Sequence, residues 1–153
     1  MTENILTTAR RMTEAEKARR ERSRDNIAAT LAVRAARAEL RINASETEAA
    51  AFEEFAARFP DLPRVNVVLL WDQCPAATKV NTRQSWPFDR TEPRRVRRSA
   101  ASLWILHTTD GALRGVEVYD KSATDPMLGN ASPRKPNVCS RSRSSNDVNL
   151  LVA

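Results

Sequence analysis

The sequence is poor in the residues that form most small-molecule sites, with only three glycines, two cysteines and one histidine among 153 residues. With so few glycines, neither a G-x-x-x-x-G-K-[ST] nor a G-x-G-x-x-G phosphate loop is present. His107 ends an apolar run and has no serine or cysteine nucleophile motif beside it, which indicates a structural or surface histidine. The sequence therefore predicts no catalytic residue and no cofactor, and we expect that the protein is not an enzyme.

Metal ligands are equally scarce. Cys74 and Cys139 lie far apart in the sequence, and with a single histidine they cannot form a zinc site on their own. We expect both to be reduced thiols of a cytosolic protein. Asp120 and Asp125 lie in "YDKSATD", where two carboxylates are more typical of turn caps than of a cation site. The sequence predicts no metal.

Long hydrophobic runs are also missing. The longest, 65–71, is interrupted by Asn66 and falls well short of the roughly 20 apolar residues that a bilayer-spanning helix needs. The charged N-terminus has no apolar segment of the kind that a secretory signal contains. We therefore expect a cytoplasmic protein without a membrane partner.

Positive charge is what the sequence has in excess. Lysine and arginine number 25 against 19 acidic residues, which gives a net charge of +6 and an isoelectric point near 10.1. This balance favours a polyanionic partner, nucleic acid first and an acidic membrane surface second. The length suits one domain with a single core, and the aromatic content of 5% predicts that this core is mainly aliphatic.

Two helices are predicted in the first 60 residues. Thr13 begins a T-x-x-E capping box, and strong helix formers without glycine or proline follow to about residue 42. Ser45 begins a second capping box, and Pro60 ends the second helix. The segment 16–25 has no apolar face and is expected to be a solvated extension. The apolar residues elsewhere recur at helical spacing, namely Ile27, Leu31, Ala35, Ala38 and Ile42, then Phe52, Phe55, Ala56 and Phe59.

The rest of the core is expected between residues 64 and 126. The valines of "RVNVVLLWDQ" favour a buried strand, whereas other residues recur at helical spacing, namely Asn66, Leu69, Leu70 and Gln73. Periodicity therefore leaves both open. Residues 81–100 read as a polar connection. Residues 103–107 and 115–120 are predicted to form an antiparallel pair with Asp110-Gly111 as the turn. The first of these strands is apolar on both faces, so we expect both to be covered.

After Asp125 the sequence is rich in serine, proline, asparagine and arginine and loses its periodicity, which is typical of a flexible tail. We therefore divide the chain into a basic helical extension at 1–44, an α+β domain at 45–126 and a flexible tail at 127–153. The predicted fold class is α+β, with N-terminal helices packed on a small antiparallel sheet and flexible basic termini.

The middle of the chain contains an ordered series of motifs. "NVVLLWDQCPAATKVNTRQSW" is followed by a basic loop, an apolar strand and "VYDKSAT". Together they resemble the N-terminal domain of ArdC-type antirestriction proteins, which has N-x-x-L-[IL]-x-x-Q-x-P-x-A-T-x-V…W, a basic loop, an apolar strand and V-F-D-[IV]-S-Q-T. The matching positions are Asn66, Leu69, Leu70, Gln73, Pro75, Ala77, Thr78, Val80 and Trp86, then Arg94, Val96, Arg97, Arg98, Trp104, Ile105 and Leu106.

The resemblance covers about residues 46–126. It implies a helix over 66–73, an α+β fold and binding of single-stranded DNA with little sequence preference. Two glycines of the family's basic loop are absent here, and Ala123 replaces the glutamine of S-Q-T. Typical relatives continue into a metallopeptidase-like domain with H-E-x-x-H; this sequence has no such motif, so no peptidase activity is implied.

The residues between 83 and 121 favour nucleic-acid binding by their chemistry as well. Single strands are held by basic grooves and by aromatic faces on which bases stack, and the planar arginine fork pairs with phosphate. Trp86 lies among polar residues and is the better stacking candidate, whereas Trp104 lies in an apolar strand and is expected in the core. The predicted nucleic-acid-binding residues are Arg83, Trp86, Arg90, Arg94, Arg95, Arg97, Arg98, Tyr119 and Lys121.

The function predicted from these features is that of a non-specific single-stranded DNA-binding protein of a mobile element or phage. It would act in antirestriction or DNA protection by occluding the strand. The alternative is a structural or interaction protein whose basic N-terminal helix docks on a partner protein or a nucleoprotein assembly. A regulator that binds duplex DNA is a third option, for which no helix-turn-helix is evident in the sequence.

Overall fold

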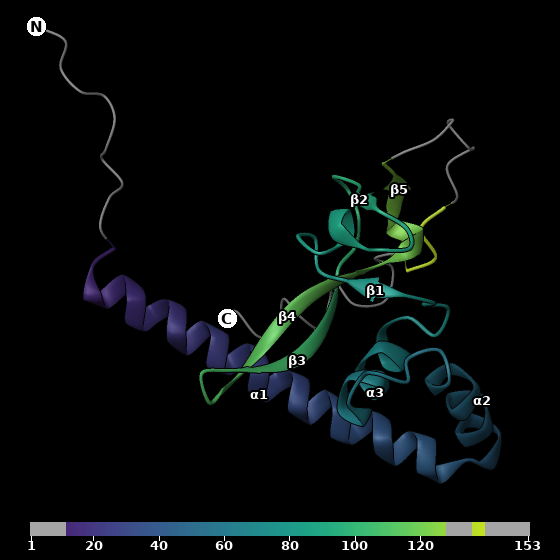
Figure 1. The fold of residues 1–153 in the computed structure, drawn as a ribbon. Helices are drawn as coiled ribbons and strands as arrows, with labels where there is room; N and C mark the ends of the chain where they lie inside the picture. Colours follow the sequence, from purple (N-terminus) through teal and green to yellow (C-terminus); the bar gives the residue numbers. More distant parts are fainter. Residues whose placement is uncertain (1–11, 128–135, 140–153) are drawn as a thin grey trace, which may run out of the picture.

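The computed structural model describes residues 12–127 and 136–139 (Figure 1). It confirms the α+β fold class. The helices are α1 (Glu14–Ala44), α2 (Glu46–Ala56) and α3 (Arg64–Gln73), with two 3₁₀ turns, η1 (Trp86–Phe88) and η2 (Lys121–Ala123). The strands are β1 (Val80–Asn81), β2 (Arg94–Val96), β3 (Leu103–Thr109), β4 (Ala112–Asp120) and β5 (Thr124–Pro126).

The strands form two separate antiparallel sheets. The larger has the order β1-β4-β3, and the smaller pairs β2 with β5. Figure 1 shows the β2–β5 pair at the end of the molecule away from α1, with α2 and α3 beside the C-terminal half of α1. Among the residues described, no helix combines the length and the apolar content that a bilayer crossing requires.

The predicted capping residues begin α1 and α2. Thr13 accepts a hydrogen bond from the backbone of Glu16, whose carboxylate accepts one from Thr13 N in return. Ser45 accepts a bond from the backbone of Glu48 at the start of α2. The first half of α1 is largely exposed, as predicted, whereas its second half contributes Leu31, Ala38 and Ile42 among others to the core. This second half is therefore part of the folded body.

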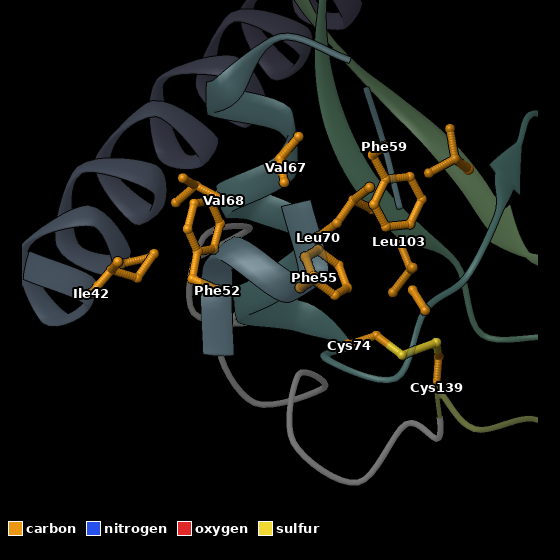
Figure 2. Close-up of a cluster of buried hydrophobic side chains, with 13 residues drawn as sticks. Ile42, Phe52, Phe55, Phe59, Val67, Val68, Leu70, Cys74, Leu103 and Cys139 are labelled. Carbon is orange, nitrogen blue, oxygen red and sulfur yellow. A yellow bond between two sulfur atoms is a disulfide. The ribbon is translucent and has the colours of Figure 1, made fainter. Parts of the chain in front are cut away.

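The ambiguous segment at 64–73 is a helix, as the resemblance implied. Its residues 66–70 are all buried, because α3 packs against α1, α2 and β3. Figure 2 shows Val67, Val68 and Leu70 of α3 grouped with Phe52 and Phe55 of α2. A helix that is buried on nearly every side has no wide polar face. Its apolar and polar residues therefore do not recur clearly enough, at a period of 3.6, to distinguish it from a strand.

The β3–β4 hairpin forms around the predicted turn. Asp110 and Gly111 both have positive φ angles, 51° and 77°, as a two-residue hairpin turn with the right-handed twist requires. Both faces of β3 are covered over residues 103–106, as expected, whereas its last three residues are exposed. Trp104 and Leu106 pack on α1, while Leu103 packs with the helices' main core. Gly115 allows α1 to cross β4 closely, since a Cβ there would lie 2.6 Å from Ile27 Cγ2.

Helix α3 also closes the open edge of β3. Asn66 Nδ2 donates to the carbonyl of Leu106, and Leu106 N donates to Asn66 Oδ1, both at 2.8 Å. Two turns further on, Gln73 Nε2 donates to the Trp104 carbonyl at 2.7 Å and Gln73 Oε1 accepts from Trp104 N at 2.8 Å. The two amide side chains thus replace a neighbouring strand along this edge.

The structure overturns the expectation of two reduced thiols. Cys74 and Cys139 form a disulfide that joins the C-terminus of α3 to residues 136–139 (Figure 2). The same segment accepts and donates hydrogen bonds at Ser122, through Asn137 and the backbone of Val138. These four residues of the predicted flexible tail are therefore fixed to the body, while 1–11, 128–135 and 140–153 lie outside the described residues. Sequence spacing could not show that two cysteines 65 positions apart are neighbours.

Replacing Asn66 with leucine should destabilise the protein by about 2–6 kcal/mol, since the buried N–H and C=O of Leu106 each lose a partner at about 1–3 kcal/mol. Urea unfolding followed by circular dichroism measures this. Gln84→Leu serves as control, because Gln84 is exposed and should change stability by less than about 0.5 kcal/mol. Equal stability of the two variants would contradict the importance of the edge closure.

Cys139→Ser should lower the free energy of unfolding by about 4 kcal/mol, the loop-closure entropy of the 65-residue separation. A reductant should destabilise the wild type by a similar amount and leave the variant unchanged, as measured by urea unfolding with and without a dithiol. Titration of two free thiols in the denatured, unreduced wild type would show that the bond is absent.

Candidate nucleic-acid interface

The predicted basic loop is part of a small folded unit built on β2 and β5. Val96 of β2 pairs with Thr124 of β5, and their sheet covers a second core of Trp86, Val96, Tyr119 and Ala123. We call residues 82–100 and 119–126 the β2–β5 unit. The sequence predicts a polar connection at 81–100 and neither of these strands, which have three residues each.

The four neighbouring arginines of this unit divide into two pairs. Arg94 and Arg97 are half-buried and structural. Arg94 donates to the side chain of Thr124 at 2.5 Å and to its carbonyl at 3.1 Å. Arg97 forms an ion pair with Asp125 at 3.0 Å. Both therefore join β2 and the residues after it to β5, and their guanidinium groups are not free for a ligand.

Arg95 and Arg98 have the opposite environment. Both side chains are exposed, and neither guanidinium has a hydrogen bond or an ion pair within the described part of the chain. Arg90, in the turn before β2, is also exposed, and its guanidinium has no hydrogen bond or ion pair to another described residue. Within β2, Arg94 and Arg95 are successive residues, so their side chains point to opposite faces. Arg97 and Arg98 follow the strand, and there the ion pair with Asp125 sets Arg97 apart from Arg98. Three of the predicted arginines are therefore available to an anion.

The two remaining basic residues of the prediction are already engaged. The guanidinium of Arg83 lies 4.9 Å from the ring centre of Tyr119, a cation–π contact, although the side chain is exposed. Lys121 forms an ion pair with Glu92 at 2.7 Å. Arg83 thus lies at the border of the unit and could still contact a phosphate, whereas the charge of Lys121 is neutralised.

The aromatic residues of the prediction cannot stack a base. Trp86 is fully buried, and its Nε1 donates to the carbonyl of Tyr119 at 2.9 Å. Tyr119 is 7% exposed and its ring is covered by Arg83. Base stacking needs an accessible ring face. The prediction of stacking at Trp86 and Tyr119 is therefore wrong; both rings form the core on which the unit folds.

The exposed aromatic residue of the unit is Phe88, which the sequence analysis missed. It follows Trp86 by two positions in η1 and is 85% exposed. A 3₁₀ turn has three residues per turn, so positions i and i+2 point in different directions. Knowing that Trp86 is buried would have indicated that Phe88 faces solvent.

Asp89 fixes the turn that follows Phe88. Its carboxylate forms an ion pair with Lys79 at 2.8 Å and accepts hydrogen bonds from the backbone of Thr91 and Glu92 at 3.1 and 2.9 Å. The hydrogen bond from Lys79, followed by the backbone bonds, lowers the pKa of Asp89 from 3.8 to about 2. The pKa of Glu92 is also lowered, chiefly by its hydrogen bond from Lys121.

A buried carboxylate joins the unit to the larger sheet. Asp120 accepts hydrogen bonds from Thr78 N at 2.9 Å, from Ser122 N at 2.9 Å and from Ser122 Oγ at 2.5 Å. This is the capping role that the sequence favoured over a cation site. Among the described residues, no group of three or more histidine, cysteine or acidic side chains could hold a metal ion.

A groove lies elsewhere, between α1, the turn at 61–63, the start of α3 and the β3–β4 hairpin, with a volume of about 1250 Å³. It is lined mainly by apolar side chains, and its Glu39 and Arg64 form an ion pair at 2.6 Å. None of the predicted nucleic-acid-binding residues lines it. The groove therefore presents no unpaired cluster of cations to a phosphate backbone.

The lowered pKa of Asp89 predicts how the stability of the fold depends on pH. A carboxylate whose folded pKa lies below its unfolded value stabilises the fold above the unfolded pKa, and this contribution is lost as the pH falls. Stability should therefore decrease between about pH 4 and pH 2, and Asp89→Asn should reduce this decrease while lowering stability at pH 7. Urea unfolding across this range measures it. Asp61→Asn, at an exposed carboxyl without a bond to another described residue, should behave as wild type.

Comparison of the chain with protein-family models, with curated proteins and with solved structures finds no match. The side chains of the β2–β5 unit are therefore the basis on which a function can be proposed. What the unit offers is three exposed and unpaired guanidinium groups and one exposed aromatic ring, all mounted on a small hydrogen-bonded body.

Proposed function

We propose that the protein binds single-stranded DNA without sequence preference through the outer surface of the β2–β5 unit. The observation that carries the proposal is the exposure of Arg90, Arg95 and Arg98, none of which pairs with a carboxylate of the described chain. Exposed arginines that form no ion pair are suited to an external anion, because no internal ion pair has to break before binding.

The chemistry of these arginines favours phosphate. A guanidinium donates two parallel hydrogen bonds to a phosphate and remains charged at every physiological pH. Phosphates are the same along every strand, so such contacts carry no sequence information. Each neutralised phosphate releases counterions, so the affinity should fall steeply with salt. The excess of six positive charges on the whole chain would assist the approach of a polyanion.

The resemblance to the N-terminal domain of ArdC-type antirestriction proteins supports single-stranded DNA as the polyanion. A protein of this kind, from a mobile element or a phage, would protect DNA by covering it, because a bound strand is closed to a nuclease. The mechanism needs no catalytic group. We therefore propose a binding protein that acts by occlusion.

A second candidate is docking on a partner protein through the first half of α1. This segment extends beyond the body in Figure 1 and is largely exposed. Its charges are interleaved and partly paired, with Lys17 bound to Glu14 at 2.7 Å and Asp25 to Arg114 at 3.4 Å. It is therefore the weaker candidate for a polyanion and the better one for a protein.

Replacing both Arg95 and Arg98 with alanine should weaken binding to every single-stranded sequence alike and leave stability unchanged. Each phosphate contact contributes about 0.7 to the slope of log affinity against log salt for single strands, so the slope should fall by about 1.4. Fluorescence anisotropy with labelled oligonucleotides of different sequence, titrated at several salt concentrations, measures both effects.

The matched control is Arg20→Ala with Arg24→Ala, which removes the same charge from the exposed half of α1. It should change the slope little. Equal losses in the two double variants would indicate attraction by net charge alone. Absence of binding by the wild type at low salt would contradict the proposal, and co-purification of a partner that survives nuclease treatment would favour the second candidate.

A further inference from the structure

Phe88 is the most exposed large hydrophobic side chain in the described part of the chain, at 85%, ahead of Leu40 at 71%. Single apolar residues on a surface are common and need no explanation by themselves. Phe88 differs in its setting, because it belongs to the same small unit as the three unpaired arginines and because its backbone is held on both sides.

The backbone before Phe88 is fixed by the second core. Trp86, two residues earlier, is fully buried and hydrogen-bonded to the Tyr119 carbonyl. Phe88 N itself donates to the carbonyl of Ser85 at 3.0 Å, and Ser85 N donates to that of Thr82 at 3.1 Å. These bonds close the turn that presents the ring to solvent.

The backbone after Phe88 is fixed by Asp89. Besides Lys79 and the two backbone amides described above, its carboxylate accepts a hydrogen bond from Asn81 Nδ2 at 3.2 Å. A ring mounted in this way has lost its backbone freedom before any ligand arrives. The entropy cost of ordering a loop is therefore absent when the ring binds, which favours affinity.

Cations lie near Phe88 both in the chain and on the neighbouring strand. Arg90 follows by two residues, and η1 packs directly against β2, whose Arg95 points outward. An accessible aromatic face beside guanidinium groups is the combination that holds single strands, in which bases stack on the ring and phosphates pair with the cations. A partner protein would meet the same ring, but it would have to supply carboxylates for three arginines.

We propose that Phe88 is the stacking platform of this site and receives one unpaired base, so that the protein selects single strands over duplexes. The inference depends on the proposed nucleic-acid binding and adds the residue that distinguishes single-stranded from double-stranded DNA. In a duplex the faces of the bases are covered by their neighbours in the stack, so a fixed ring finds none without unstacking the helix. The arginines contact the phosphates of single strands and duplexes alike, so it is the ring that distinguishes the two forms of DNA.

The test compares Phe88→Ala, Phe88→Leu and Phe88→Trp in the full chain. The probe is a labelled oligodeoxythymidine of about 16 nucleotides and a duplex of equal length. Alanine and leucine should weaken single-strand binding about 5- to 150-fold, the equivalent of one base stack at about 1–3 kcal/mol. Tryptophan should retain it, because its ring also stacks. Duplex binding should be unchanged in all three.

Leu113→Ala is the matched control, since Leu113 is an exposed apolar residue at the distant hairpin end. It should bind as wild type does. Circular dichroism spectra that match the wild type confirm that each variant is folded, as expected for an exposed side chain.

The outcomes separate this inference from the function on which it depends. If Arg95→Ala with Arg98→Ala weakens binding and Phe88→Ala does not, the stacking role is overturned and the proposed function stands. Leucine binding as well as phenylalanine would also overturn stacking, because leucine is apolar without a flat ring. Equal losses on single strands and duplexes would overturn strand selection. A wild type that binds neither probe at low salt overturns the proposed function itself.

Discussion

The rest of the structure depends on the contact between α3 and the edge of β3. Asn66 and Gln73 each present one donor and one acceptor to a residue of the strand, as a neighbouring strand would. Because these four bonds fix the distance between helix and strand, the fully buried Leu69 and Leu70 can fill the space behind them. A short three-stranded sheet gains a covered edge without a fourth strand, and the edge is closed to pairing with other chains.

The same contact supports the candidate interface at a distance. With β3 held, the nine-residue β4 runs beyond the main core and ends at Tyr119 and Asp120. There its last residues pair with β1 and provide the buried ring and the buried carboxylate around which the β2–β5 unit folds. The exposed arginines and Phe88 are thus mounted on a unit with its own small core. Binding that depends on position, and not only on charge, requires such a rigid support.

The parts of the fold that could be predicted from the sequence have local causes. Capping at Thr13 and Ser45 and the turn at Asp110-Gly111 depend on residues within a few positions of one another. The pairing of β2 with β5 joins residues about 30 positions apart through three-residue strands, which have no detectable period. Without that pairing, no argument from sequence could separate Arg94 and Arg97 from Arg95 and Arg98, or Trp86 from Phe88. The resemblance directed attention to this segment, but only tertiary structure showed which of its side chains face outward.

The disulfide has a topological consequence for the interface. Cys74 and Cys139 close a covalent ring that contains the whole β2–β5 unit, from the turn before η1 to the end of β5. A single cut in the backbone anywhere between these cysteines opens the ring but leaves every part of the chain attached. The exposed basic surface is rich in arginine, at which trypsin-like proteases cleave, so a nicked chain would still carry both halves of the site until the sulfur–sulfur bond is reduced.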